Sequence, residues 1–375
     1  MKRKILGIMI AVVLMIGVGY FLCDALMAEQ AEATTQPSLV GQTEPTHEIS
    51  FMPTRDYQGI TYEGRSSNNL TTVLLIGYDH KDNGELIPNQ EGYIYGGQSD
   101  FLLLLAIDHD RKQVRPLQIN RDTITDVKFY SKKGAYYGTR RMQVCLSHAY
   151  GDTQEVNNRN AIWAVENLLG IAGEKDGAQI DWYLSMDITG IDRLNDLLGG
   201  VTVPINDDFS YYDPTMIQGT TMTLNGAQAQ IYCRQRYYIG VQSNEARMER
   251  QHIYMKAATE KLAALLRDDS DYAMTLLNGM GLIFDNTQAA DDEFDFTSVF
   301  GGGTPVTDTP THYLMTNRSL QSIVSTLMRA MEYEVCDVEL LPGEHRIGTS
   351  GHMEYIMEEG AGLKWALDTL YTPLN

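Results

Sequence analysis

The chain has 375 residues and a formal net charge of −20 at pH 7, with 43% hydrophobic and 21% charged residues. This length is enough to bury a full hydrophobic core, and the composition is that of a globular protein. The acidic balance excludes broad binding to nucleic acid or to anionic membranes through bulk charge.

The N-terminus combines a basic start with a long apolar run. MKRK precedes ILGIMIAVVLMIGVGYFL, which extends from Ile5 to Leu22 without a charge. A run of this length predicts a transmembrane helix, which we place at residues 5–27. The preceding positive charges orient residues 1–4 toward the cytoplasm and the remainder of the chain outside. The alternative is a signal peptide cleaved near AEA at residues 31–33.

The first part of the exported chain divides into a linker and a folded domain. Residues 28–69 are predicted to be an extracytoplasmic linker because they are rich in Thr, Gln, Glu and Pro and poor in apolar residues. The domain is placed at residues 70–375, and it opens with the strand Thr71–Gly77. Phe101–Asp108 and Gln113–Asn120, separated by HDRK, predict an antiparallel hairpin.

Helical and strand patterns alternate after residue 150. Paired glycines and apolar spacing mark several helix ends. Helices are predicted at residues 158–171, 188–200, 224–236, 244–268, 319–333 and 362–371, strands at 181–187, 201–205 and 335–343, and an acidic surface loop at 291–311. Strands interleaved with helices predict an α/β layer architecture with a mixed sheet.

Common catalytic motifs are missing from the sequence. It contains no G-x-S-x-G, Walker A, H-E-x-x-H or C-x-x-C pattern. Cys145, Cys233 and Cys336 have no metal-ligand spacing and are predicted to be free buried thiols. His148 stands alone and is expected to have a core or surface role. An enzyme made from this chain would therefore work with carboxylates and arginines.

Charged residues gather where the first three strands begin or end. Asp79 follows the first strand, Asp100 opens the second, and Arg121 and Asp122 close the third. Loops at strand ends build the sites of α/β sheets, so these groups are expected to converge. Asp79 and Asp100 could share Mg²⁺, which prefers a few carboxylates with water and phosphate oxygens. The alternative for each aspartate is a turn or capping role.

The stretch CRQRYYIGVQSNEARMERQ concentrates arginines in an acidic protein. Arg247 and Arg250 are three residues apart at the start of a predicted helix, where free N–H groups and the helix dipole favour anions. Arginine also suits bidentate phosphate recognition. The alternative is a solvated helix face on which Glu245 and Glu249 pair with the arginines. The spacing by itself leaves both readings open.

Six motifs occur in an order that resembles the LytR-CpsA-Psr family. They are LLIGYD, GGQSDFLLLLAID, INRDT, LLGGV, LNGAQAQIYCRQR and NEARMERQ, and they span residues 70–262 behind one signal-anchor helix. The resemblance implies a three-layer α/β/α domain with a mixed central sheet, whose hydrophobic groove holds a polyprenyl chain. It also implies Mg²⁺ near the pyrophosphate.

The function implied by this resemblance is phosphotransfer at the outer face of the cytoplasmic membrane in Gram-positive-type bacteria. Such enzymes move a teichoic acid or a capsular or secondary wall polysaccharide from undecaprenyl pyrophosphate to the N-acetylmuramic acid of peptidoglycan. Two alternatives are a pyrophosphatase acting on the prenyl-linked glycan and a polyprenyl-phosphate-binding regulatory module without catalysis.

The resemblance also implies roles for particular residues. Asp79 and Asp100 match the metal-site aspartates, and Asp122 or Asp100 would accept the proton of the attacking hydroxyl. The residues that match the phosphate-binding positions are Arg121, Arg234, Arg236, Arg247, Arg250 and Gln251. Phosphoryl transfer needs mainly positioning and charge neutralisation, so arginines and a metal suffice.

The chain departs from the family pattern at three places. Asn120 stands where the family usually has proline, and QVC at residues 143–145 replaces a K-x-N motif. Asn244-Glu245-Ala246 replaces the usual Asp-Phe-Gly. These departures put the local acceptor or metal contacts in doubt more than the phosphate-binding arginines.

Overall fold

The computed structural model describes most of the chain after residue 53. The described residues are 54–66, 68–79, 97–130, 135–151, 153–172, 180–188, 190–235, 237–240, 244–268, 272–284, 313–330, 333–349 and 351–374. The predicted transmembrane segment 5–27, Arg236 and the predicted loop 291–311 lie outside them. Within the described ranges, no helix is both long and apolar enough to cross a membrane.

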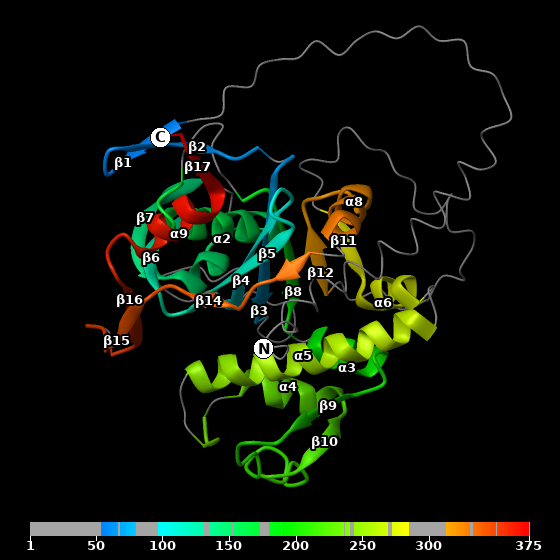
Figure 1. The fold of residues 1–375 in the computed structure, drawn as a ribbon. Coiled ribbons are helices and arrows are strands. Elements are labelled where there is room, and N and C mark those ends of the chain that lie inside the picture. The colour runs from blue at the N-terminus through cyan, green and yellow to red at the C-terminus, as the bar shows by residue number, and fades with distance from the viewer. Residues whose placement is uncertain are drawn as a thin grey trace, which may run out of the picture.

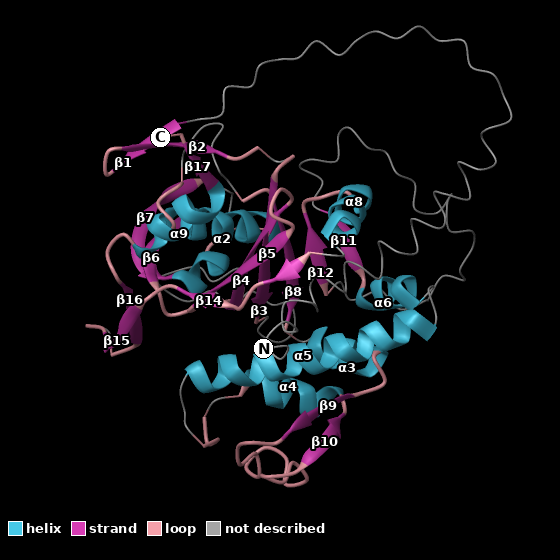
Figure 2. Ribbon diagram, viewed as in Figure 1, coloured by secondary structure: helices cyan, strands magenta, loops and turns pink. Residues whose placement is uncertain are grey.

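A mixed sheet forms the centre of the domain (Figures 1 and 2). Its strand order is β11-β12-β8-β3-β4-β5-β13, and β14 also pairs with β5. The strands are β3 Leu70–Tyr78, β4 Ser99–Asp108, β5 Gln113–Ile119, β8 Trp182–Asp187, β11 Leu282–Phe284, β12 Leu314–Thr316, β13 Glu334–Val335 and β14 Glu339–Leu340. β4 runs antiparallel to β3 and β5, whereas β8 runs parallel to β3. The predicted hairpin and the mixed character of the sheet are confirmed.

Helices cover both faces of this sheet. The helices are α2 Gln154–Leu168, α3 Gly190–Leu197, α4 Gly226–Arg234, α5 Asn244–Asp268, α6 Tyr272–Met280, α8 Leu320–Ala330 and α9 Ala361–Leu370, with the 3-10 helix η1 at Val144–Ala149. Figure 1 shows α2 and α9 on one side of the sheet and α8 on the other. The helix predicted at 244–268 has the predicted bounds, and the helix predicted at 158–171 begins four residues earlier and ends three earlier.

Strand alternation explains the two apolar layers. Leu74 and Leu104 face the cluster made with α2 and α9, whereas Leu75 and Leu103 face the cluster that includes residues of α8. Successive side chains on a strand point to opposite faces, so a strand covered on both sides needs a continuous apolar run. This requirement accounts for the uninterrupted LLLLAI sequence of β4.

Several short strands lie outside the central sheet. They are β1 Thr54–Tyr57, β2 Ile60–Gly64, β6 Ile124–Tyr130, β7 Tyr136–Gln143, β9 Val201–Pro204, β10 Thr221–Leu224, β15 Gly343–Ile347, β16 Met353–Met357 and β17 Tyr371–Pro373. The strand predicted at 201–205 exists but pairs with β10 instead of joining the central sheet. The remaining members of this group have little apolar periodicity, and the sequence did not indicate them.

The boundary of the folded domain differs from the expected one. β1 and β2 fall within the predicted linker 28–69, yet β2 pairs with β17 at the end of the chain. Arg65 then binds Asp108 at 2.6 Å through buried side chains. The composition of residues 54–65 predicted a linker because they are polar. They are nevertheless part of the fold, since they pair with segments that are distant in the sequence.

Glu166 on α2 should make stability depend on pH. Burial raises its pKa from 4.5 to about 7, against the hydrogen bond from the Ile180 N–H and the charge of Lys128, which both lower it. The folded chain therefore keeps a proton that the unfolded chain has lost between pH 4.5 and 7. The stabilising effect of that proton is complete below about pH 4.5 and is lost as the pH rises through 7, by up to about 3 kcal/mol.

Urea denaturation at pH 5 and pH 8 tests this expectation. Glu166→Gln should remove the part of the pH dependence that burial creates, because glutamine accepts the same hydrogen bond without ionising. Glu155→Gln, on the same helix but half-exposed, is the control and should keep the parent dependence. An unchanged pH dependence in Glu166→Gln would contradict the assignment.

Candidate active site at one edge of the sheet

Strand directions bring the predicted site residues to one edge of the sheet. β3 and β5 both run antiparallel to β4, so the ends of β3 and β5 lie beside the start of β4. Asp79 follows β3, Asp100 lies at the start of β4, and Arg121 follows β5. The convergence expected from the strand ends is therefore a consequence of the topology.

A β-bulge presents Asp100. In the β3–β4 ladder Gly77 pairs with Phe101 and Tyr78 pairs with Ser99, so Asp100 has no residue opposite it. An extra residue of this kind bends its strand and redirects its side chain, and bulges are frequent beside active sites. The carboxylate of Asp100 thereby turns toward arginines from two other parts of the chain.

Two arginines hold the Asp100 carboxylate between them. Arg121 Nη1 pairs with Oδ1, and Arg247 Nη1 pairs with Oδ2 at 2.9 Å. The side chains of all three are at most 11% exposed. The shared carboxylate holds both guanidinium groups at the sheet edge, where Asp122 also lies 3.5 Å from Arg121, and guanidinium groups fixed in this way suit phosphate oxygens.

Arg121 has further neighbours around this pair. Its Nη2 donates to Gln98 Oε1 at 2.6 Å and to Cys145 Sγ at 3.2 Å. Burial disfavours its charged form, but Cys145, Asp100 and Asp122 raise the pKa of Arg121 above its ordinary value. The guanidinium group is therefore charged and fixed in orientation before any ligand arrives.

Asp79 is the second carboxylate at this edge. Burial raises its pKa, as does the charge of Asp100, while the Gln98 N–H, Arg234 and Arg121 lower it. Arg234, the last residue of α4, is half-buried, and its charge acts on Asp79. The charges of Asp100 and Arg234 therefore both act on Asp79.

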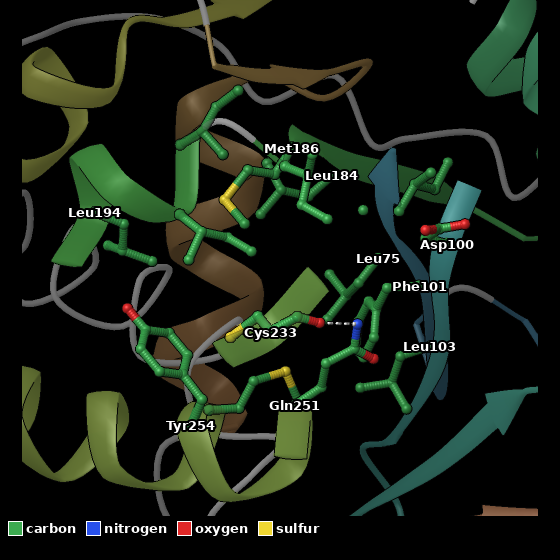
Figure 3. Close-up of a pocket in the computed structure, with 16 residues that line it drawn as sticks. Leu75, Asp100, Phe101, Leu103, Leu184, Met186, Leu194, Cys233, Gln251 and Tyr254 are labelled. Atoms are coloured by element: carbon green, nitrogen blue, oxygen red, sulfur yellow. Dashed lines mark hydrogen bonds between the residues drawn. The ribbon is translucent and has the colours of Figure 1, made fainter. Parts of the chain in front are cut away.

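Arg250 and Gln251 lie beside the end of α4. Arg250 Nη1 pairs with Asp207 Oδ2 at 2.9 Å, and its remaining nitrogens donate to the carbonyl oxygens of Tyr232 and Gln235. Gln251 Nε2 donates to the carbonyl oxygen of Cys233 at 3.2 Å, the dashed line in Figure 3. Arg250 and Arg247 thus have different partners, although they are only three positions apart.

The solvated-face reading of these arginines is wrong. Arg247 and Arg250 are each 3% exposed, and they form ion pairs with Asp100 and Asp207, respectively. Glu249 is exposed to solvent. The arginines face the fold because α5 packs against β9 and α4, which leaves little open helix surface around them.

An apolar cavity of about 120 Å³ opens beside Asp100 (Figure 3). Strand residues such as Leu75, Leu103 and Leu184 form one wall, and helix residues such as Leu194 and Tyr254 form the other. Its walls are almost wholly hydrocarbon, so the cavity favours an apolar ligand. A charged edge and an apolar cavity thus adjoin at Asp100.

Two of the three cysteines and His148 are buried as expected, whereas the prediction of a buried thiol is wrong for Cys336. Cys145 and Cys233 are buried free thiols, and Cys336 is a half-buried one. His148 is buried, stacks on Tyr78 with ring centroids 4.5 Å apart, and contacts the carbonyl oxygen of Gly97 at 2.9 Å. The role predicted for His148 is confirmed.

Some residues at the site carried no recognised signal. Gln98 contacts both Arg121 and the Asp79 carboxylate, and Gln143 Nε2 donates to Asp122 Oδ1 at 2.9 Å. His345 Nε2 lies 3.1 Å from Asn120 Nδ2, which joins the β15–β16 hairpin to the loop before Arg121. Of these residues, Asn120 and Gln143 stood out in the sequence, each as a departure from the family pattern.

Comparison with known proteins finds a family and relatives named for cell wall biosynthesis and teichoic acid transfer. Residues 28–267 match the LytR_cpsA_psr family. The chain is 27% identical over 225 residues to the polyisoprenyl-teichoic acid–peptidoglycan teichoic acid transferase TagU of Enterococcus faecalis, covering 58% of this chain and 64% of the relative. It is 23% identical over 215 residues to the cell wall biosynthesis protein LcpA of Corynebacterium glutamicum, covering 53% and 41%.

Comparison with solved structures finds a protein of similar fold. The chain superposes on the crystal structure of protein gbs0355 from Streptococcus agalactiae with a TM-score of 0.56 and 18% identity, covering 83% of this chain and 93% of the other. The matches to TagU and LcpA span less than two thirds of each relative. The family match itself covers more than half of this chain, from residue 28 to residue 267. The chain therefore belongs to the LytR-CpsA-Psr family.

Proposed function

We propose that this chain is a phosphotransferase that moves a glycopolymer from a polyprenyl pyrophosphate carrier to the N-acetylmuramic acid of peptidoglycan. The observation that carries the proposal is the buried arrangement of Arg121, Asp100 and Arg247 at the rim of an apolar cavity. A polyprenyl pyrophosphate has the same two parts, an anion and a hydrocarbon chain. The names of the TagU and LcpA relatives, from teichoic acid transfer and cell wall biosynthesis, support this assignment.

In this proposal the arginines bind and orient the pyrophosphate. Arg121 and Arg247 are charged groups held in place by Asp100, so they need little rearrangement when phosphate oxygens arrive. Arg234 and Arg236 would extend the positive edge at the end of α4. Arg250 and Gln251 would support that edge through Gln235 and Cys233.

The transfer step exchanges the phosphoanhydride bond of the pyrophosphate for a phosphoester bond to the acceptor. The oxygen of the acceptor 6-hydroxyl attacks the phosphorus that carries the glycan, and the bond from that phosphorus to the bridging oxygen breaks. Polyprenyl phosphate leaves with the bridging oxygen, and Asp122 or Asp100 accepts the hydroxyl proton. Charge neutralisation by Arg121 and Arg247 lowers the barrier without an enzyme nucleophile.

The two aspartates also fit a role in holding Mg²⁺. Asp79 and Asp100 are close enough that the charge of Asp100 raises the pKa of Asp79, and a divalent cation would relieve this repulsion. Among the described residues, no group of three or more His, Cys, Asp or Glu side chains could hold a metal. Two carboxylates completed by water and phosphate oxygens match the preference of Mg²⁺, which when bound would neutralise charge on the pyrophosphate.

The proposed location is the outer face of the cytoplasmic membrane. The apolar run 5–27 would anchor the chain with its basic N-terminus inside. A linker from residue 28 would then tether the domain close to a carrier lipid in the same membrane. This arrangement gives the catalytic domain access to both lipid-linked donor and peptidoglycan acceptor.

Filling the cavity should weaken donor binding. Met186 lies on β8 and lines the cavity, so Met186→Trp would occupy space that the polyprenyl chain needs. Excluding two or more methylene groups, at about 0.8 kcal/mol each, should raise the KM for the lipid-linked donor roughly tenfold or more. Met222→Trp, a half-buried strand methionine outside the cavity lining, is the control and should keep the parent KM.

A transfer assay tests the proposed function directly. The full chain is incubated with Mg²⁺, a lipid-linked glycan and purified peptidoglycan, and equal amounts of peptidoglycan-bound glycan and polyprenyl phosphate are expected. Release of polyprenyl phosphate at the same rate without peptidoglycan would instead indicate a pyrophosphatase. Retention of prenyl lipid without turnover, detected by mass spectrometry, would indicate a regulatory module.

A further inference from the structure

Three tyrosines pack together on the surface beyond the end of α4. Tyr211 and Tyr238 are 66% and 64% exposed, and their rings stack with centroids 4.5 Å apart. The ring of Tyr212 meets Tyr211 edge-on at 5.1 Å. We refer to Tyr211, Tyr212 and Tyr238 as the tyrosine platform. Large aromatic surfaces that a fold leaves in water commonly mark an interaction site.

The platform joins two separate connections of the chain. Tyr211 and Tyr212 lie between β9 and β10, whereas Tyr238 lies between α4 and α5. Arg250 ties these connections together: it pairs with Asp207 in the first and donates to the Gln235 carbonyl oxygen in the second. Its guanidinium group also lies 5.6 Å from the ring centre of buried Phe209. The platform is therefore built on a buried cation and is preorganised.

The backbone of Tyr238 adopts an unusual conformation. Its φ angle is +55°, in the left-handed region that disfavours residues with a Cβ atom. The next residue, Ile239, is fully buried and fixes the turn. Strained non-glycine residues persist where the surrounding structure imposes them, and they cluster at functional sites. Tyr238 places an exposed ring against Tyr211, and its backbone is under conformational strain that a glycine at this position would avoid.

The charges around the platform select its ligand. Residues 201–225 contain Asp207, Asp208 and Asp213 and no lysine or arginine, whereas Arg250 pairs with Asp207 and Arg234 stands four residues before Tyr238. The segment that carries Tyr211 and Tyr212 therefore lacks the lysine and arginine that usually accompany aromatic residues at a membrane interface. An uncharged sugar fits, because its C–H face can lie on a tyrosine ring and its hydroxyl groups can donate to carboxylates.

The platform also lies close along the chain to the proposed phosphate-binding edge. Tyr238 is four residues after Arg234, so their Cα atoms are at most about 14 Å apart. Arg234 in turn acts on Asp79, and its neighbour Cys233 lines the apolar cavity. The first few sugars attached to a phosphate at this edge can therefore reach the tyrosines.

We propose that the tyrosine platform is a binding subsite for uncharged pyranose units of the glycan whose phosphate lies at the arginine edge. The assignment rests on the proposed function for the identity of the glycan, and on Tyr211, Tyr238 and Asp207 for the sugar contact. The rings bind the apolar face of a pyranose, and carboxylates of the same loop, such as Asp208, accept from its hydroxyl groups. The subsite positions the donor and takes no part in bond making.

Sugar binding to the full chain tests the proposal without requiring catalysis. The probe is the β-1,4-linked tetramer of N-acetylglucosamine, a soluble uncharged pyranose chain, titrated by calorimetry. Tyr211→Ala and Tyr238→Gly should each weaken binding at least tenfold. Tyr238→Gly should leave the Tm unchanged or raised, because glycine adopts φ +55° without strain. Tyr137→Ala, which removes a tyrosine that is 79% exposed on β7, is the matched control and should bind as the parent does.

Several outcomes would overturn the subsite. The first is that the parent chain shows no saturable binding of the tetramer, and the second is that the platform variants bind it as tightly as the parent does. The third is a lower Tm of Tyr238→Gly together with the affinity of the parent, which would show that the Tyr238 ring has a structural role. Binding to phosphatidylglycerol vesicles that the variants lose would assign the platform to the membrane instead. Parent KM for lipid-linked donor in both variants also contradicts the proposal, whereas failure of transfer with intact, tyrosine-dependent sugar binding would contradict only the proposed function.

Discussion

Arg121→Ala is expected to lower kcat/KM for glycopolymer transfer by about a thousandfold or more. Arg121 pairs with Asp100, which lines the apolar cavity, and the transferred phosphoryl group would gain charge beside this pair in the transition state. Arginines that neutralise this charge contribute about 10³–10⁵ in rate in other phosphoryl-transfer enzymes. Steady-state transfer kinetics, with circular dichroism to establish folding, measure the effect.

Two further variants separate charge from general damage to the fold. Arg121→Lys should recover only part of the activity, since an ammonium group keeps the charge but lacks the planar fork that contacts Asp100, Gln98 and Cys145 together. Arg141→Ala, which removes a 67% exposed side chain on β7, should stay within about twofold of the parent. A folded Arg121→Ala protein with more than about a tenth of the parent activity would contradict the assigned role.

Arg250→Ala should mainly lower stability. The change leaves the Asp207 carboxylate and the carbonyl oxygens of Tyr232 and Gln235 without a buried partner. Removing one member of a buried ion pair typically costs about 3–5 kcal/mol of the free energy of unfolding. Urea denaturation of the purified domain-bearing chain measures this loss.

An exposed arginine provides the comparison for Arg250. Arg193 on α3 is exposed and donates to the Gly279 carbonyl oxygen at 3.1 Å, so Arg193→Ala should cost less than about 1 kcal/mol. Unchanged stability in Arg250→Ala with a large loss of pyrophosphate affinity would show that Arg250 binds phosphate directly. Measuring stability and pyrophosphate affinity together therefore distinguishes a structural role of Arg250 from direct contact with the ligand.

Much of the central sheet was predictable because its strands are buried on both faces. The strands around Thr71–Gly77 and Phe101–Asp108 need continuous apolar runs, and such runs are visible in a sequence. The peripheral hairpins β6–β7 and β15–β16 were missed because solvent covers much of their surface and their residues alternate weakly. β1 and β2 were missed for the same reason, and β17, which pairs with β2, lies some 300 residues away along the chain, from about 60 to about 370.

The sequence by itself determined the chemical parts of the site: carboxylates and arginines at successive strand ends and a second arginine group at the start of a long helix. Local spacing could not decide what each part does. Only the tertiary structure aimed Asp100 through a bulge, joined it to Arg121 and Arg247, and assigned Arg250 to Asp207. The physical reason is that burial and ion pairing depend on which distant segments meet. Arg247 and Arg250, three positions apart on one helix, therefore have different roles: Arg247 lies at the proposed ligand site, and Arg250 stabilises the fold.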